Sequence, residues 1–82
     1  MVTVKFNSLL RKAAGVPEYQ SSAASVKEVL KEVKSRYGPG VDRYLAASVI
    51  TVNGRNIHEL KGSRTKLADG DEVSLFPPVA GG

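Results

Sequence analysis

The stretch that decides the fold is SVKEVLKEVKSRYGPG, residues 25–40. Its apolar side chains recur at the spacing i, i+3, i+4, i+7, which places them on one face of a helix. This apolar stripe consists of Val26, Val29, Leu30 and Val33. Ser25 and Glu28 fit a capping box, in which the serine oxygen accepts from an early helical N–H while the glutamate reaches back. Glycine and proline follow Tyr37 and end the helix. The stretch therefore predicts an amphipathic helix with one apolar face to bury.

Four segments outside this helix have the composition or the alternation of β-strands. They lie at residues 2–6, 18–22, 48–52 and 72–76. Turn signals, Asn53-Gly54 and Asp69-Gly70-Asp71, stand beside the last two. Strands around one amphipathic helix form an α+β layer pair, because the helix must cover one apolar face of a sheet. For one domain of 82 residues we expect a β-grasp fold, a mixed sheet of four to five strands packed on one long helix.

The segments between these elements are less regular. A short helix is expected over residues 9–13, capped by Asn7-Ser8 and stopped by Gly15. Residues 41–47 fit either a loop or a helical turn. Three apolar residues are expected to anchor the irregular stretches before the last strand: Ile57, Leu60 and Leu67.

The composition offers no self-contained active site. The chain has no cysteine, which excludes a disulfide and thiol chemistry carried by a side chain. The one histidine, His58, is expected at the surface, and no His/Cys/Asp/Glu cluster with metal-ligand spacing accompanies it. A serine nucleophile would need a base and an orienting group, and no Gly-x-Ser-x-Gly elbow is present. Asp69, Asp71 and Glu72 are expected to form a turn, because aspartate side chains bond to nearby backbone.

The formal net charge of +4 raises the question of a nucleic-acid ligand. Lys27, Lys31 and Lys34 alternate with glutamates along the predicted helix, which is typical of a solvated face. Three further cations fall in a predicted loop without the alternating aromatic residues that a single-strand binder needs: Lys61, Arg64 and Lys66. We expect no nucleic-acid partner, and the mildly basic surface suits an acidic protein partner equally well.

No segment has the pattern of a membrane span or a secretory signal. Apolar runs stay well below the roughly 18 residues that a spanning helix needs. The opening MVTVKFNSLL lacks the charged-then-apolar layout of a signal peptide. The expectation is a cytoplasmic protein with no membrane partner.

The last predicted strand leads into DGDEVSLFPPVAGG, residues 69–82. Alternation places Val73 and Leu75 inward and Phe76 outward, next to Pro77-Pro78. An exposed phenylalanine forgoes a burial worth about 2 kcal/mol, and exposed apolar groups commonly mark a protein interface. The alternative is that Phe76 tucks under the loops between Ile57 and Leu67.

Residues 1–76 are therefore expected to form the domain, with residues 77–82 as a flexible Pro-Pro-Val-Ala-Gly-Gly tail. The two prolines favour an extended stretch, and Gly81-Gly82 allows bare backbone to enter a narrow channel. Six extended residues reach about 20 Å at most. The Gly82 carboxylate is ionised at neutral pH and is a poor electrophile. Once another enzyme activates it as an acyl adenylate, sulfur or an amine can attack it.

The stretches VTVKFNSLLRKAAGV (2–16) and DGDEVSLFPPVAGG (69–82) resemble those of the ubiquitin-like sulfur carriers, specifically the small subunit of molybdopterin synthase. The resemblance implies a β-grasp fold and a ubiquitin-activating-type enzyme that uses ATP to adenylate Gly82. Sulfur transfer then leaves a thiocarboxylate on that residue. The large synthase subunit would receive the tail, and the sulfur would pass to a pterin precursor in molybdenum-cofactor synthesis.

The resemblance also implies roles for the last seven residues. Gly82 would react, the stretch Val79-Ala80-Gly81 would enter the partner's channel with it, and Phe76, Pro77 and Pro78 would contact the partner. No bound cofactor or metal is implied, and the ATP belongs to the activating enzyme, so the chain is non-catalytic alone. Small archaeal modifier proteins share this ending, which leaves a second use open: conjugation to lysines of target proteins through the same Gly82 carboxyl group.

Overall fold

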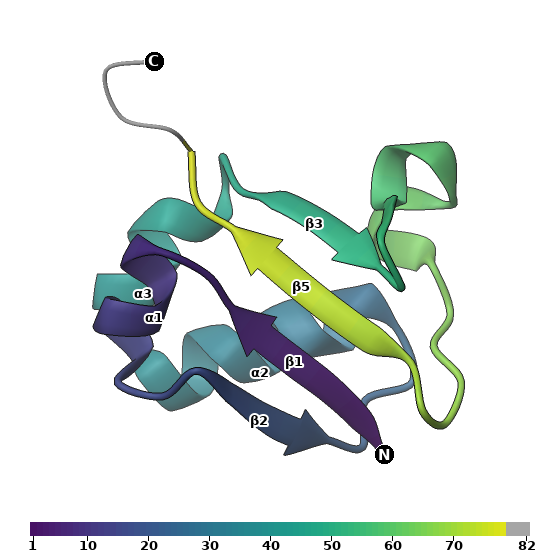
Figure 1. The fold of residues 1–82 in the computed structure, drawn as a ribbon, viewed down its shortest axis with the longest axis horizontal. Coiled ribbons are helices and arrows are strands. Elements are labelled where there is room, and N and C mark those ends of the chain that lie inside the picture. Colours follow the sequence, from purple (N-terminus) through teal and green to yellow (C-terminus); the bar gives the residue numbers. More distant parts are fainter. Residues whose placement is uncertain (79–82) are drawn as a thin grey trace.

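Five strands form a mixed sheet in the computed structural model, which describes residues 1–78 (Figure 1). The strands are β1 (Val2–Phe6), β2 (Glu18–Ser21), β3 (Val49–Val52), β4 (Arg55–Asn56) and β5 (Glu72–Phe76). Their order is β2-β1-β5-β3-β4. The strands nearest the two ends of the sequence, β1 and β5, lie side by side and parallel in the middle, and the other neighbouring pairs are antiparallel. The centre of the sheet therefore forms only when distant parts of the chain meet.

The predicted main helix is α2 (Val26–Tyr37), which lies across one face of the sheet (Figure 1). Its apolar stripe is confirmed, since the valines of the stripe are fully buried and Leu30 is half-buried. The Ser25 Oγ accepts from the Glu28 N–H at 3.3 Å, as a capping box requires. The Glu28 carboxylate accepts from the N–H of Ala24 at 2.7 Å, one residue before the cap. The box therefore also ties down the chain that enters the helix.

The expectation of one long helix is incomplete, because two shorter helices, α1 (Leu9–Ala14) and α3 (Pro39–Leu45), also pack on the core. The ambiguous residues 41–47 belong largely to α3. The chain turns from α2 into α3 at Gly38, whose φ of 72° suits glycine, and Pro39 then supplies a φ ready for a first helical turn. Val41 and Leu45 of α3 are buried. The short helix thus closes a part of the core that α2 does not reach.

The core lies between the helices and one face of the sheet. Alternate strand residues point into it, including Val4, Val73 and Leu75, each fully buried. The rings of Tyr19 and Phe6 stack with centroids 5.9 Å apart, and the Arg36 guanidinium lies 4.3 Å from the Tyr19 centroid. Burial is the main cause that raises the pKa of the Tyr19 phenol above its ordinary range. Tyr19, on the edge strand β2, therefore closes one side of the core as a neutral side chain.

Two predicted turns meet at the end of the sheet where β5 begins. Asn53-Gly54 joins β3 to β4 with φ values of 51° and 84°, as a two-residue hairpin loop of type I′ requires. The Asn53 side chain accepts from the N–H of Glu72 at 2.9 Å and donates to the Asp71 carboxylate at 3.0 Å. The same carboxylate accepts from the Ala68 N–H at 2.8 Å. Asp71 is confirmed as a turn former, whereas Glu72 is wrong as one because it begins β5, and Asn53 links the two turns.

Acid is expected to weaken the fold through Asp71. The hydrogen bonds from the Ala68 N–H and the Asn53 amide hold the pKa of the Asp71 carboxyl below its ordinary value. A lowered folded-state pKa adds stability that is present above the unfolded-state pKa of about 3.9 and is lost as the pH falls through the folded value. We expect Asp71→Asn to be about 1 kcal/mol less stable at neutral pH, because it loses a charged acceptor, and less sensitive to acid.

Urea denaturation at a series of pH values measures this effect. Glu59→Gln is the matched control, because the exposed Glu59 side chain makes no hydrogen bond within residues 1–78. The control should follow the parent chain. An Asp71→Asn stability that falls in acid as steeply as that of the parent would contradict the assignment.

None of the helices within residues 1–78 has the length and apolar content needed to cross a lipid bilayer.

Candidate functional site

Strand β5 positions the start of the predicted tail. Val73 and Leu75 point into the core with no exposed surface, while the Phe76 side chain is 40% exposed on the outer face. Because β5 lies between β1 and β3, its backbone is held by neighbours on both sides. The strand continues directly into Pro77. A rigid central strand therefore sets where the last residues leave the domain.

Asn7 fixes the end of that strand. Its backbone N–H and its side-chain amide both donate to the Leu75 carbonyl, each at 3.1 Å. The predicted cap of α1 is confirmed in position, because Ser8 is its N-cap residue, but the Ser8 side chain makes no capping hydrogen bond and its φ is 53°. Asn7 follows β1 directly, and parallel pairing places it beside the end of β5. Its amide therefore holds the neighbouring strand, one residue before Phe76.

Phe76 and Val49 form an apolar surface, the Phe76–Val49 patch. The two residues are paired in register between β5 and β3, and 40% and 47% of their respective surfaces are exposed. The alternative position for Phe76, under the loops between Ile57 and Leu67, is wrong. Those loops follow β4 at the other end of β3, where Val52 pairs with Val73. The predicted outward orientation of Phe76 is confirmed.

Pro77 is half-buried and Pro78 is exposed, so the structure describes the first two tail residues. The predicted channel residues Val79, Ala80 and Gly81 and the predicted reacting residue Gly82 lie outside the described residues. What the geometry supplies is a platform: an apolar patch and an anchored strand end from which those four residues continue.

Sequence reasoning missed two members of this platform. The Val49 side chain points to the opposite face of β3 from the buried Ile50 and Val52. The alternation within residues 48–52 could therefore have predicted that Val49 is exposed. Nothing local marks the hydrogen bonds of Asn7, because their acceptor, Leu75, lies at the far end of the sequence.

The rest of residues 1–78 offers no competing reactive centre. No group of three or more potential metal-ligating residues occurs there. His58 is exposed, as predicted, and its backbone N–H donates to the Asn56 side chain at 2.9 Å. Within this described part of the chain, the candidate features are the anchored end of β5 and the Phe76–Val49 patch.

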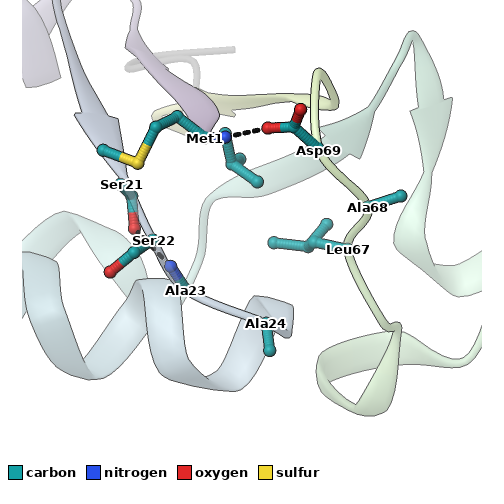
Figure 2. A pocket seen from close by; sticks show the side chains of 9 residues that line it. Met1, Ser21, Ser22, Ala23, Ala24, Leu67, Ala68 and Asp69 are labelled. Carbon is teal, nitrogen blue, oxygen red and sulfur yellow. Dashed lines mark hydrogen bonds and ion pairs between the residues drawn. The ribbon is translucent and has the colours of Figure 1, made fainter.

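A hollow of about 260 Å³ lies at the end of the sheet where β1 and β5 begin (Figure 2). Small side chains line it, among them Ala23 and Ala24, and the Met1 amino group is hydrogen-bonded to the Asp69 carboxylate beside them. Ser21 is one of its two serines, and its Oγ accepts from the Ala23 N–H at 3.0 Å. No histidine or lysine lines this hollow to act as a base for them.

Comparison with known proteins places the chain among small β-grasp proteins. The profile of the ThiS family matches residues 4–82. Small archaeal modifier protein 3 of Haloferax volcanii is 38% identical over 65 residues, which cover 72% of this chain and 71% of that protein. The solution structure of small archaeal modifier protein 1 from Methanosarcina acetivorans superposes with a TM-score of 0.88 at 35% identity, covering 99% of this chain and 95% of that one.

A further similar structure is the complex of subunits 1 and 2 of the molybdopterin-converting factor from Helicobacter pylori. Its matching chain has a TM-score of 0.72 and 27% identity, covering 99% of this chain and 97% of that one. The likeness to these solved structures, together with the five-stranded mixed sheet, confirms the predicted β-grasp fold.

Proposed function

Because the chain belongs to the ThiS family of ubiquitin-like sulfur carriers, we propose that it carries sulfur on the carboxyl group of Gly82 for molybdenum-cofactor synthesis. The observation that carries the proposal is the direct continuation of the central strand β5 into the Pro-Pro-Val-Ala-Gly-Gly ending. A carrier of this kind needs a stable domain, a docking surface and a reactive end that reaches beyond the domain.

The proposed chemistry takes place at the backbone. An adenylating partner enzyme supplies ATP, and a Gly82 carboxylate oxygen bonds to the α-phosphorus while pyrophosphate leaves. A sulfur nucleophile at the oxidation level of sulfide then attacks the carbonyl carbon. A C–S bond forms, the C–O bond to AMP breaks, and Gly82 becomes a thiocarboxylate. The side chains of this protein supply no acid or base, so their proposed task is to present the terminus to the partner.

The platform explains how presentation would work. The anchored end of β5 holds the start of the tail, and the Phe76–Val49 patch offers exposed apolar surface directly beside it. A partner that covers this patch would exclude water from Phe76 while residues 79–82 enter the partner's channel. The likeness to the molybdopterin-converting factor complex supports a large synthase subunit as one such partner and a pterin precursor as the sulfur acceptor.

Intact-mass spectrometry of the protein from its native cells tests the proposal. We expect a fraction of the chain to carry one sulfur in place of one oxygen, located on Gly82 by fragmentation. Incubation with alkylating reagent should modify only this fraction, because the chain has no cysteine. A Gly82 carboxylate that stays unmodified in the presence of the adenylating enzyme, ATP and a sulfur donor would contradict the carrier role.

A second candidate function is conjugation to lysines of other proteins. Two specific observations favour it: the relative of 38% identity and the structure with a TM-score of 0.88 are both named small archaeal modifier proteins. The same acyl adenylate serves this use, with a lysine amine in place of the sulfur nucleophile. Peptide digests of cell extracts should then contain lysines that bear a remnant of the tail. Their absence, alongside a detected thiocarboxylate, would leave sulfur transfer as the function.

Gly81→Ala is expected to leave the fold unchanged and to slow adenylation by about 100-fold, as a misplacement of about 1 Å at a reacting centre can do. The added methyl group would crowd a channel shaped for bare backbone. Pyrophosphate release with the adenylating enzyme and ATP measures the rate. Ala80→Gly is the matched control, because it removes a methyl group one residue earlier and should change the rate little. A Gly81→Ala rate equal to that of the parent would rule out the narrow channel.

A further inference from the structure

A cluster of three cations lies in the connection between β4 and β5. This connection contains two short 3₁₀ turns, η1 (Ile57–Glu59) and η2 (Gly62–Arg64). The exposed residues Lys61, Arg64 and Lys66 line a surface hollow of about 480 Å³, and no carboxylate lines it with them.

The cations of this cluster have no acidic partner among residues 1–78. The ion pairs of this described part involve other groups: the Met1 amino group with Asp69, Lys5 with Glu72, and Lys34 with Asp42. Like charges that are held together repel one another, and the repulsion is relieved when an anion binds between them. The hollow is therefore complementary in charge to an acidic ligand.

The backbone that carries the cations is well ordered by hydrogen bonds. The Lys61 N–H donates to the Thr65 hydroxyl at 3.1 Å, the Arg64 N–H donates to the Lys61 carbonyl at 3.1 Å, and Thr65 is buried. An isolated β-bridge between Lys66 and Ser25 ties the segment to the start of α2. The positions of the three side chains are thus fixed at their base, so binding a ligand would require little ordering of the loop.

The same hydrogen bonds decide which anion fits. The N–H groups of Leu60, Lys61, Arg64 and Thr65 are all used inside the segment, so they are not free to cradle a phosphate group. The long side chains of Lys61, Arg64 and Lys66 therefore supply the charged donors to a ligand. A second hollow of about 430 Å³ shares Lys61 and Lys66 and is also lined by Leu60 and Glu59, so it adds apolar surface and one carboxylate beside the cations. No aromatic residue lines either hollow to stack a base.

We propose that this surface, made of Lys61, Arg64, Lys66 and Leu60, docks an acidic segment of a protein partner that contains both carboxylates and apolar side chains. The surface follows β4 in the sequence, and its two 3₁₀ turns contact β3 and α2, whereas Phe76 lies at the other end of β5 from Glu72. A partner bound here leaves the Phe76–Val49 patch free. The interaction is thus a second point of attachment, separate from the proposed chemistry at Gly82, and would raise the local concentration of the tail at its target.

A titration of the full-length, ¹⁵N-labelled chain with the acetylated peptide Glu-Leu-Asp-Glu-Leu-Glu tests the proposal. We expect chemical-shift changes centred on residues 57–66 and an affinity that falls as salt is added. Lys61→Ser/Arg64→Ser should weaken binding by about tenfold, as expected for the loss of two ion pairs. Lys27→Ser/Lys31→Ser removes two exposed lysines of α2 for the same change in charge, and it should stay within about twofold of the parent.

Four results would overturn the proposal. They are no binding at low salt, equal weakening in both double variants, equal binding of the neutral peptide Gln-Leu-Asn-Gln-Leu-Gln, and tighter binding of inorganic pyrophosphate than of the acidic peptide at the same residues. The last would identify a small-anion site instead. The titration involves no adenylation, so its failure leaves the proposed function of Gly82 intact, and an unreactive Gly82 would leave the docking surface intact.

Discussion

A chain that lacks only Gly82 is expected to unfold at the same temperature as the full-length protein and to be adenylated at least about 100-fold more slowly. The buried apolar residues of the described chain all lie between Val2 and Leu75, so the truncation removes nothing from that core. It moves the terminal carboxylate back by about 3.5 Å, the length of one extended residue. A displacement of that size removes the carboxylate from attacking distance of the α-phosphorus of ATP.

Thermal unfolding and pyrophosphate release with the adenylating enzyme measure the two halves of this prediction. A chain with one alanine added after Gly82 is the complementary variant, because its carboxylate is displaced in the opposite direction, and it should fail in the same way. The control is a chain with one alanine added before Met1. It has the same length as the C-terminally extended chain but an unaltered tail, and it should be adenylated at the rate of the parent. If the truncated chain reacts as fast as the parent, the position of the carboxylate is immaterial and the proposed carrier chemistry falls.

The elements that the sequence predicted well are those set by local periodicity. The stripe of α2 and the cap at Ser25 depend on residues within one or two helical turns, and both are present in the structure. Strand β5 was equally readable, because a turn and a proline pair bound its alternating residues. Its alternation also predicted the outward direction of Phe76, the one proposed docking residue whose orientation the sequence indicated.

What the local pattern did not contain was the pairing between distant segments. The parallel contact of β1 with β5 joins strands some 70 residues apart, and no short-range signal specifies it. The hydrogen bond of the Asn7 side chain follows from that contact, so a capping role for this side chain was the natural but incorrect interpretation. Helix α3 has only seven residues, too few to show a clear period, and its burial depends on the packing of its neighbours.

The second large effect is expected from two adjacent residues, Leu75 and Phe76, whose side chains point to opposite faces of β5. Leu75→Ala should lower the free energy of unfolding by about 2–5 kcal/mol, because it leaves a cavity at a fully buried site. Phe76→Ala should lower it by about 1 kcal/mol or less, because the ring is already 40% exposed. For binding to the adenylating enzyme we expect the reverse order: Phe76→Ala should weaken binding more than Leu75→Ala. Loss of an aromatic anchor at an interface commonly costs about 2 kcal/mol, or roughly 30-fold in affinity.

Urea denaturation gives the first comparison, and calorimetric titration with the adenylating enzyme gives the second. Val49→Ala provides a graded test, since Val49 is paired with Phe76 on the same face but presents a smaller side chain, and it should weaken binding less than Phe76→Ala. A loss of about 3–5 kcal/mol in the stability of Phe76→Ala would make that ring a core residue. Unchanged binding by both exposed-face variants would place the docking surface elsewhere. If Leu75→Ala has the larger effect on stability and Phe76→Ala the larger effect on binding, one face of β5 must hold the domain together while the other contacts a partner.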